Sequence, residues 1–235
     1  MADVTPVDQV VEHLVNLLEK RRAGLFTDFD GTLSPLAPTP DAATIEPSAA
    51  IALGELTAHI DVVGIVTGRA AEDARVRAGI PDLLYVGNHG LEWMHQGQHT
   101  IHPAGIATER VLGPALSAIR QRLEQVASPE GVIFEDKRLS GSIHYRLSED
   151  PLAVGSQLAS ITDEVAQEYG LRVSAGKMVF ELRPLAEVNK GTALEMLITQ
   201  HHLDVAVFFG DDMTDVDGFL ALGRIARQSD TRVCS

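Results

Sequence analysis

The fold is decided by the stretch GLFTDFDGTL, which occupies residues 24–33. Its first four residues form a short apolar run that stops abruptly at Asp28. An apolar run without polar alternation is typical of a strand that is buried on both faces of a sheet. Three more runs of this kind occupy residues 61–66, 83–86 and 205–209, and polar residues follow each of them. The sequence therefore predicts four buried strands that all end in polar residues.

Helical patterns lie between these runs, near residues 47–59, 70–79 and 190–201. Strands that alternate with helices predict an α/β fold with a doubly wound parallel sheet. In such sheets the ligand crevice lies beyond the carboxyl ends of the strands. We therefore expect the polar ends of the four runs to converge on one site.

The middle of the chain has a different pattern, in which a helix followed by two strands occurs twice. The helices are expected near 107–127 and 152–169. This pattern predicts a small α+β module inserted into the α/β core. We expect the core to comprise residues 1–102 and 183–235, and the insert to comprise residues 103–182.

Composition limits the class of protein. The chain has 235 residues, of which 45% are hydrophobic, and these suffice for a sizeable core. Its one cysteine, Cys234, excludes a disulfide framework and fits a reducing compartment. The first residues lack the basic and apolar segments of a signal peptide, so we expect a cytoplasmic protein. A monomer is favoured, although no residue pattern decides the oligomeric state.

The net charge of −14 argues against nucleic acid or an anionic membrane as a partner. No apolar run approaches the length that crosses a membrane. The same charge opposes a phosphorylated substrate, so a phosphate site in this chain requires local cations.

Asp28 and Asp30 are the first candidate site residues. Two carboxylates two positions apart at the end of a buried strand face the same crevice, repel each other and require a cation. Magnesium prefers carboxylate oxygen, and an aspartate can attack phosphorus as a nucleophile. The alternative is that Asp30 and Gly31 merely form a turn.

Thr67 and Lys190 are candidate phosphate ligands. The Thr67 hydroxyl and the neighbouring backbone N–H suit a phosphate oxygen, although Thr67 could instead cap the next helix. Asn189 is expected to cap a helix and to place Lys190 in its first turn, where a cation opposes the helix dipole. A lysine at that position favours phosphate binding over an ordinary solvated side chain.

The segment GDDMTD at residues 210–215 supplies more carboxylates. We expect Thr214 to be an N-cap, which would give Asp215 an ordinary place at the start of a helix. Asp211 and Asp212 have no such role and require a counter-cation. Asp211 is therefore a predicted magnesium ligand, together with either Asp212 or Asp215.

These four elements, in this order, resemble the haloacid dehalogenase (HAD) superfamily of phosphatases. The resemblance implies a Rossmann-type core in which Asp28 is the nucleophile and Asp30 the general acid and base. It also implies that Thr67 and Lys190 bind phosphate. A Mg²⁺ site is expected from the carboxylates of Asp28 and Asp211 and the backbone carbonyl of Asp30, with Asp212 as a further metal candidate.

Four shorter segments narrow the resemblance to the trehalose-6-phosphate phosphatase family, over residues 20–222. They are GNHGLE at 87–92, EDK at 135–137, HYR at 144–146 and GKMVFELRP at 176–184. The resemblance implies that Glu135, Lys137 and Glu181 bind sugar hydroxyls. Further candidates for substrate binding are Arg69, Asn88, His89, His144 and Arg146. The last two lie two positions apart and are expected on one face of a strand.

The family resemblance implies an enzyme, a trehalose-phosphatase that hydrolyses trehalose 6-phosphate to trehalose and phosphate, the last step of trehalose biosynthesis. It implies Mg²⁺ as the cofactor and an aspartyl-phosphate intermediate. Three alternatives stay open: a phosphatase for sucrose phosphate or mannosyl-phosphoglycerate, an inactive regulatory relative, and a phosphate-accepting signalling receiver. The receiver is disfavoured because its adjacent acidic pair normally comes first.

Two further features lead to structural expectations. The tail at residues 223–235 is polar and departs from the family, so we expect the C-terminal edge strand to be missing. His95, His99 and His102 are interrupted by Gly97, which favours a polar hairpin over a metal site.

Overall fold

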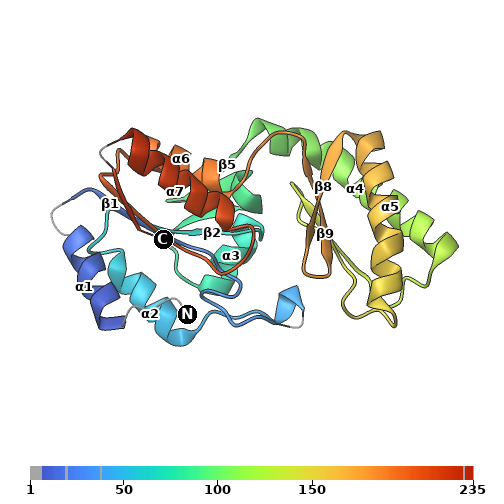
Figure 1. Ribbon diagram of the computed structural model, residues 1–235, viewed down its shortest axis with the longest axis horizontal. Helices are drawn as coiled ribbons and strands as arrows, with labels where there is room; N and C mark the ends of the chain where they lie inside the picture. Colours follow the sequence, from blue (N-terminus) through green and yellow to red (C-terminus); the bar gives the residue numbers. More distant parts are fainter. Residues whose placement is uncertain (1–6, 19–20, 38, 230, 235) are drawn as a thin grey trace. The chain divides into compact units, whose positions relative to one another are not determined.

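The computed structural model describes residues 7–18, 21–37, 39–229 and 231–234. They form two compact units, and Figure 1 shows the helices and strands of each. The core combines Met1–His99 with Asn189–Ser235, and the insert is Thr100–Val188. The module predicted at residues 103–182 lies within the second unit.

A seven-stranded sheet forms the centre of the core. Neighbouring strands from β11 to β3 are parallel, and β4 pairs with β3 in the antiparallel direction. The four predicted strands correspond to β1, β2, β3 and β10, which confirms the α/β fold. The strand order is β11 (Arg232–Cys234), β10 (Val205–Phe209), β1 (Ala23–Thr27), β2 (Val62–Val66), β3 (Leu84–Gly87), β4 (Glu92–His95) and β5 (Gln98–Ile101).

Helices cover both faces of this sheet, as a doubly wound fold requires. Successive residues of a strand point to opposite faces. On β1, Leu25 therefore packs into one apolar cluster and Phe26 into another. The Leu25 cluster includes side chains of α1 (Val7–Leu18), α2 (Pro47–Leu56) and α3 (Ala71–Ala78). The Phe26 cluster includes side chains of α6 (Lys190–Gln200) and α7 (Val216–Gln228).

Two short 3₁₀ segments complete the core. They are η1 (Pro40–Ala42) and η2 (Asn88–Gly90), and η2 directly follows β3. The predicted polar hairpin is formed by β4 and β5, which are neighbours in the sheet. Its histidines contact different groups: His99 pairs with Glu92, and His102 accepts a hydrogen bond from the backbone of Ala104. They do not converge on a metal site.

The insert has its own four-stranded antiparallel sheet with two helices. A row of apolar residues across this sheet, from Phe134 through Ile143 to Phe180, belongs to the cluster that the helices form. The elements are α4 (Pro103–Val126), β6 (Ile133–Asp136), β7 (Gly141–His144), α5 (Pro151–Tyr169), β8 (Leu171–Gly176) and β9 (Val179–Pro184), with strand order β6-β7-β9-β8.

The neighbouring row of the insert sheet is polar. It runs from Glu135 through Ser142 and Glu181 to Ser174, one residue on each strand. Because successive residues alternate between faces, this row lies on the face opposite the helices. We call that surface the polar face of the insert.

The expectation that the core lacks a C-terminal edge strand is wrong. β11 pairs with β10, with Val233 opposite Ala206 and Cys234 opposite Val207. An edge strand of three residues needs few apolar side chains, and Val233 and Cys234 pack against opposite faces of the sheet. Positions 230 and 235 of the predicted tail lie outside the described residues.

Two local predictions also need correction. Helix α7 begins at Val216 with Asp215 as its N-cap, so Thr214 is not the cap. Strand β7 ends at His144, so Arg146 does not share a strand face with it. Arg146 lies beyond the strand and donates to the backbone carbonyl of Lys177.

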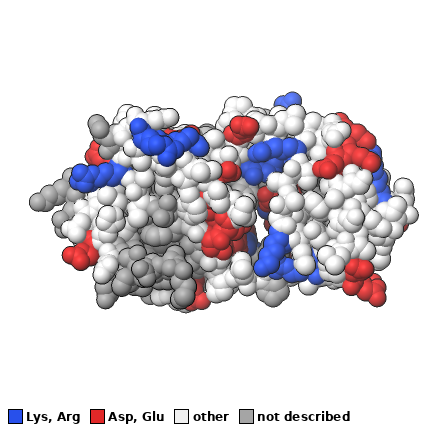
Figure 2. Space-filling model, in the orientation of Figure 1, with Lys and Arg blue, Asp and Glu red and all other residues white. Residues whose placement is uncertain are grey.

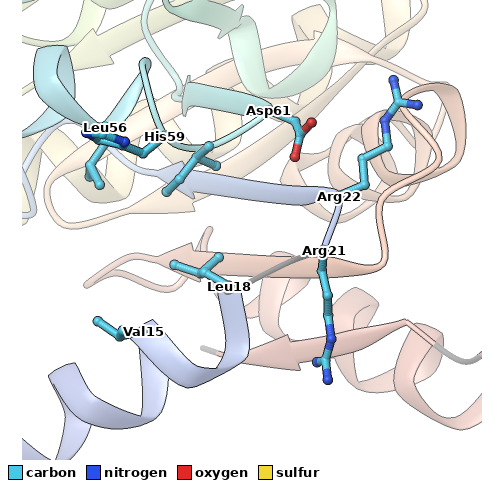
Figure 3. Close-up of a pocket in the computed structure, with 8 residues that line it drawn as sticks. Val15, Leu18, Arg21, Arg22, Leu56, His59 and Asp61 are labelled. Atoms are coloured by element: carbon cyan, nitrogen blue, oxygen red, sulfur yellow. The ribbon is translucent and has the colours of Figure 1, made fainter.

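A hollow of about 600 Å³ lies at the amino ends of β1 and β2 (Figure 3). Ligands of such sheets bind beyond the opposite, carboxyl ends. The hollow is therefore separate from the predicted site. Its lining consists of Val15, Leu18, Arg21, Arg22, Leu56, His59, Ile60 and Asp61.

Among the described helices, none combines the length and the hydropathy that a membrane span requires. On the face shown in Figure 2, the basic side chains form separate small groups rather than one continuous surface.

Candidate active site

Asp28 lies at the carboxyl end of the central strand β1. Its backbone N–H donates to the carbonyl of Phe209 at the end of β10, 2.8 Å away, which anchors the residue between two strands. Only 4% of Asp28 is exposed. Burial raises the pKa of Asp28 to about 7; Lys190 opposes this rise and Asp215 adds to it.

Lys190 joins two buried carboxylates. Its Nζ lies 2.9 Å from Asp28 Oδ1 and 2.7 Å from Asp215 Oδ1. Burial alone would lower the pKa of Lys190, but the two carboxylates outweigh it and the pKa is raised. The lysine therefore carries a full positive charge inside the protein.

The local sequence explains where Lys190 sits. Asn189 caps α6 through the backbone N–H of Thr192, and the Thr192 hydroxyl accepts from the Asn189 backbone. This reciprocal capping box confirms the predicted helix start and places Lys190 at the first helical position. A cation is unfavourable there unless carboxylates face it, as Asp28 and Asp215 do.

Asp215 organises the last acidic segment. Its Oδ2 accepts hydrogen bonds from the backbone N–H groups of Asp211 and Asp212, each at 3.1 Å. This loop brings one carboxylate oxygen each of Asp28, Asp211 and Asp215 within 4.8 Å of one another. Partial burial raises the pKa of Asp211, and the neighbouring Asp212 and Asp215 add to the rise.

Three carboxylates at this spacing fit a hard divalent cation such as Mg²⁺. The turn after Asp28 also leaves room for Asp211. Gly31 has φ +87°, and a Cβ there would collide with the Asp211 carboxylate. The Asp212 carboxylate instead accepts from the backbone N–H and the hydroxyl of Thr214, at 2.6 and 2.7 Å. The grouped carboxylates thus include Asp215, whereas Asp212 faces its own turn.

Asp30 is held by Arg69. The guanidinium donates to both Asp30 oxygens at 2.7 Å, in a bidentate pair, and also to Asp73 at 2.8 Å. A further donation reaches the carbonyl of Pro40, and the guanidinium carbon lies 5.4 Å from the centre of the Phe29 ring. Arg69 is buried whereas the Asp30 side chain is 39% exposed, so the pair presents the Asp30 carboxylate to solvent.

Thr67 directly follows β2, and the segment that it begins is hydrogen-bonded to η2. Thr67 is 1% exposed, and its hydroxyl accepts from the backbone N–H of Arg69 at 3.2 Å. Asn88 is fully buried and donates to Glu92, so its side chain faces the interior. The His89 ring lies behind Gly68, where a Cβ would be 2.6 Å from Nε2.

The other predicted substrate residues are grouped on the polar face of the insert. Lys137 Nζ lies 3.4 Å from Glu181 Oε1 and 3.9 Å from Glu135 Oε2. His144 Nε2 lies 3.1 Å from Glu135 Oε2, and the Ser142 hydroxyl donates to Glu181 at 3.4 Å. These mixed donors and acceptors could bind hydroxyl groups of a sugar. Arg146 does not join them.

Two residues that sequence reasoning did not single out support this site. Asp73 pairs with both Arg69 and Arg77, and these hydrogen bonds, against the effect of burial, hold its pKa below the ordinary value. A signal was available, because Asp73 lies four residues after Arg69, in the first turn of the helix that follows it. Glu92 accepts hydrogen bonds from Asn88 of η2 and from Ala71 of α3, and no local sequence pattern indicates these contacts.

The chain is similar in sequence to known proteins of one family. Residues 26–233 match the family described as trehalose-phosphatase. The trehalose-phosphate phosphatase of Mycobacterium marinum is 38% identical over 209 residues, which cover 86% of this chain and 52% of that protein. This chain therefore spans about half the length of the curated relatives it matches.

Two solved structures resemble this one. A trehalose-6-phosphate phosphatase related protein has a TM-score of 0.71 at 28% identity, covering 86% of this chain and 83% of that chain. The C-terminal domain of Candida albicans trehalose-6-phosphate phosphatase has a TM-score of 0.78 at 23% identity, covering 92% and 80% respectively. The second likeness, at this identity, shows the fold alone.

Proposed function

The chain belongs to the trehalose-phosphatase family, and we propose that it hydrolyses trehalose 6-phosphate in a Mg²⁺-dependent reaction through an aspartyl-phosphate. The observation that carries the proposal is the placement of Asp28. It is a buried carboxylate at the end of the central strand, 2.9 Å from a charged lysine and grouped with two further carboxylates. Relatives that share this chain's sequence are named trehalose-phosphate phosphatase.

Asp28, Asp211 and Asp215 would hold the metal, because their grouped oxygens offer the ligands that Mg²⁺ prefers. When bound, Mg²⁺ would neutralise these carboxylates and the phosphate that approaches them. The ion and Lys190 together make the site locally attractive to an anion in a chain of net charge −14.

Asp28 begins the reaction as the nucleophile. One of its carboxylate oxygens bonds to phosphorus, and the bond from phosphorus to the sugar oxygen breaks. Asp30 gives a proton to that leaving oxygen, which releases neutral trehalose. Lys190 and the Thr67 hydroxyl contribute hydrogen bonds to the phosphate oxygens during this transfer.

The second half returns the enzyme to its starting state. Asp30, now a carboxylate, takes a proton from a water molecule whose oxygen bonds to phosphorus. The bond from phosphorus to Asp28 breaks, phosphate leaves, and Asp28 is again a carboxylate. One water is consumed, and the Asp30 proton is restored. In this scheme Arg69 orients Asp30 through the bidentate pair.

The polar face of the insert is proposed to determine the specificity for the sugar part of the substrate. Glu135, Lys137 and Glu181 together offer several donors and acceptors, which suits a ligand rich in hydroxyl groups. A cytoplasmic location is proposed from the single cysteine, Cys234, which is free.

The test is phosphate release from trehalose 6-phosphate with and without Mg²⁺, in wild type, Asp28→Asn and Asp163→Asn. Asp163 is an exposed residue of α5, so the second variant controls for the substitution itself. Parallel assays use sucrose phosphate, mannosyl-phosphoglycerate and p-nitrophenyl phosphate. We expect release that requires Mg²⁺, prefers trehalose 6-phosphate and is lost only in Asp28→Asn.

Other outcomes separate the parts of the proposal. Preference for another sugar ester would overturn the substrate and keep the mechanism. Equal turnover of trehalose 6-phosphate and p-nitrophenyl phosphate would overturn the selective role of the insert. A folded chain that releases no phosphate from any ester would overturn the enzymatic function and favour a regulatory relative.

A further inference from the structure

The N-terminus of helix α3 is capped by a side chain from another strand. Its N-cap residue is Ala70, which has no side-chain group to accept a hydrogen bond from the first turn. The carboxylate of Glu92, on β4, takes this role: its Oε1 accepts from the backbone N–H of Ala71 at 2.9 Å. A negative charge there also faces the positive end of the helix dipole.

Glu92 holds two more groups. The same Oε1 accepts from the side-chain amide of Asn88 at 2.7 Å, and Oε2 lies 2.7 Å from Nε2 of His99. Glu92 itself is 5% exposed. One buried carboxylate therefore joins the start of α3, the segment η2 and the strand β5.

The segment that Glu92 holds has an unusual backbone. Asn88 has φ 49° and His89 has φ 56°, a left-handed conformation that residues other than glycine adopt rarely. Such residues persist where the surrounding structure fixes them, and they concentrate at functional sites. The Glu92 carboxylate fixes Asn88 by accepting a hydrogen bond from the side-chain amide of Asn88.

This segment in turn supports the loop that precedes α3. The backbone N–H of Asn88 donates to the carbonyl of Arg69 at 2.7 Å, and that of His89 donates to the carbonyl of Thr67 at 2.9 Å. The backbone carbonyls of Thr67 and Arg69 are thus both held by hydrogen bonds from two adjacent residues of η2. Ala71, bound directly by Glu92, holds the other end of the same loop.

We propose that Glu92 is a positioning residue, which fixes the loop from Thr67 to Ala71 so that the Thr67 hydroxyl meets the phosphate end of the substrate and Arg69 keeps Asp30 in place. This inference rests on the proposed function, since it assigns the phosphate end to that loop. Glu92 contacts neither substrate nor metal in this account, and it acts through Ala71 and Asn88.

The test measures binding of inorganic phosphate and of trehalose separately, by calorimetry on the full chain with Mg²⁺. Glu92→Ala removes all three contacts. Glu92→Gln keeps an acceptor for Ala71 and Asn88 and can donate to His99 in one ring tautomer. Glu72→Gln is the matched control, because Glu72 is an exposed residue of α3 that pairs with Arg75.

We expect Glu92→Ala to weaken phosphate binding by about tenfold, the order of loss that a small misplacement of binding groups causes. Trehalose binding should stay unchanged in this variant, and Glu92→Gln and Glu72→Gln should both bind phosphate like wild type. A merely structural role would lower the folded fraction without separating the two ligands. Unchanged phosphate affinity in folded Glu92→Ala would overturn the proposal.

A second variant covers the case in which Glu92→Ala does not fold. Asn88→Gly allows the left-handed backbone and removes the side-chain amide that donates to Glu92. A selective loss of phosphate affinity in Asn88→Gly supports the proposal, and wild-type affinity overturns it. If wild type binds phosphate but not trehalose, the proposed substrate fails, while a loss of phosphate affinity in Glu92→Ala still supports the role of Glu92.

Discussion

The carboxyl edge of the core sheet and the polar face of the insert hold their charged groups in different ways. In the core, Lys190 and its two carboxylates are almost inaccessible and lie 2.7 to 2.9 Å apart. On the insert, Glu135 is 30% exposed, and Lys137 lies 3.4 and 3.9 Å from its two carboxylate neighbours. The contacts of the first arrangement are short and buried, whereas those of the second are longer and include a partly exposed carboxylate.

This difference fits the two tasks proposed for these surfaces. Attack on phosphorus requires reacting groups fixed to within a fraction of an ångström, which short buried contacts between elements of a sheet provide. Recognition of hydroxyl groups tolerates movement, because solvent-accessible charges exchange water for ligand at little cost. We therefore expect substitutions in the core to change stability and turnover, and those on the insert to change KM.

Removal of the buried lysine should have the largest effect on stability. Lys190→Met leaves Asp28 and Asp215 without their shared cation, which should lower the free energy of unfolding by about 3–5 kcal/mol. Urea denaturation measures the change, and Lys177→Met, at an exposed turn, is the matched control. Equal stability of the two variants would show that the contacts of Lys190 with Asp28 and Asp215 do not stabilise the core.

Replacement of the bidentate arginine should lower turnover. Arg69→Lys keeps the charge but loses the paired contact to Asp30, so kcat should fall by roughly 10–100-fold with little change in KM. Arg75→Lys is the control, since Arg75 makes the same kind of pair with Glu72 on the surface. A rise in KM at constant kcat would instead assign Arg69 to substrate binding, as the sequence analysis expected.

Mg²⁺ binding should depend on pH. The pKa of Asp28 is raised to about 7, so without metal this carboxyl takes up a proton as the pH falls through that value. Protons then compete with Mg²⁺, and the apparent affinity should fall by up to about tenfold per pH unit below neutrality. Mg²⁺ titrations at about pH 6 and about pH 8 measure this. Asp28→Asn should lose the dependence, and equal affinities in wild type would contradict the buried, protonatable carboxyl.

The insert should give the smallest effect and the most selective one. Glu181→Gln keeps the side chain's size but removes its charge from the pair with Lys137. KM for trehalose 6-phosphate should rise by about 5–10-fold, while the free energy of unfolding should fall by about 1 kcal/mol, less than in Lys190→Met. Turnover of p-nitrophenyl phosphate should not change. Glu168→Gln on α5 is the control, and a matching loss with both substrates would contradict a role in sugar recognition.

The sequence predicts features that depend on one segment at a time. The run before Asp28 predicts a buried strand because both faces of β1 are apolar, and Asn189 predicts a helix start because its side chain can reach Thr192. β11 was missed because three residues at a sheet edge carry no period, and only Val233 and Cys234 need to be apolar.

Contacts that follow no periodic pattern account for the rest of the differences. Asp215 binds the backbone of Asp211 and Asp212, and this decides which carboxylates gather beside Asp28. Glu92 reaches Ala71 across 21 positions, and its residue type alone does not indicate a bracing role. Sequence spacing cannot supply such pairings, because the first depends on the conformation of the loop after β10 and the second arises only once β4 lies beside the start of α3.

The most direct test of the central assignment is to look for phosphate bound to Asp28 during turnover. Wild type and Asp28→Asn are mixed with trehalose 6-phosphate and Mg²⁺, quenched in acid within the first turnover, and digested for mass spectrometry. We expect phosphate on the peptide that contains Asp28 in wild type and on no peptide of the variant. Rapid turnover without covalent phosphate at any time, or phosphate on a different peptide, would contradict Asp28 as the nucleophile.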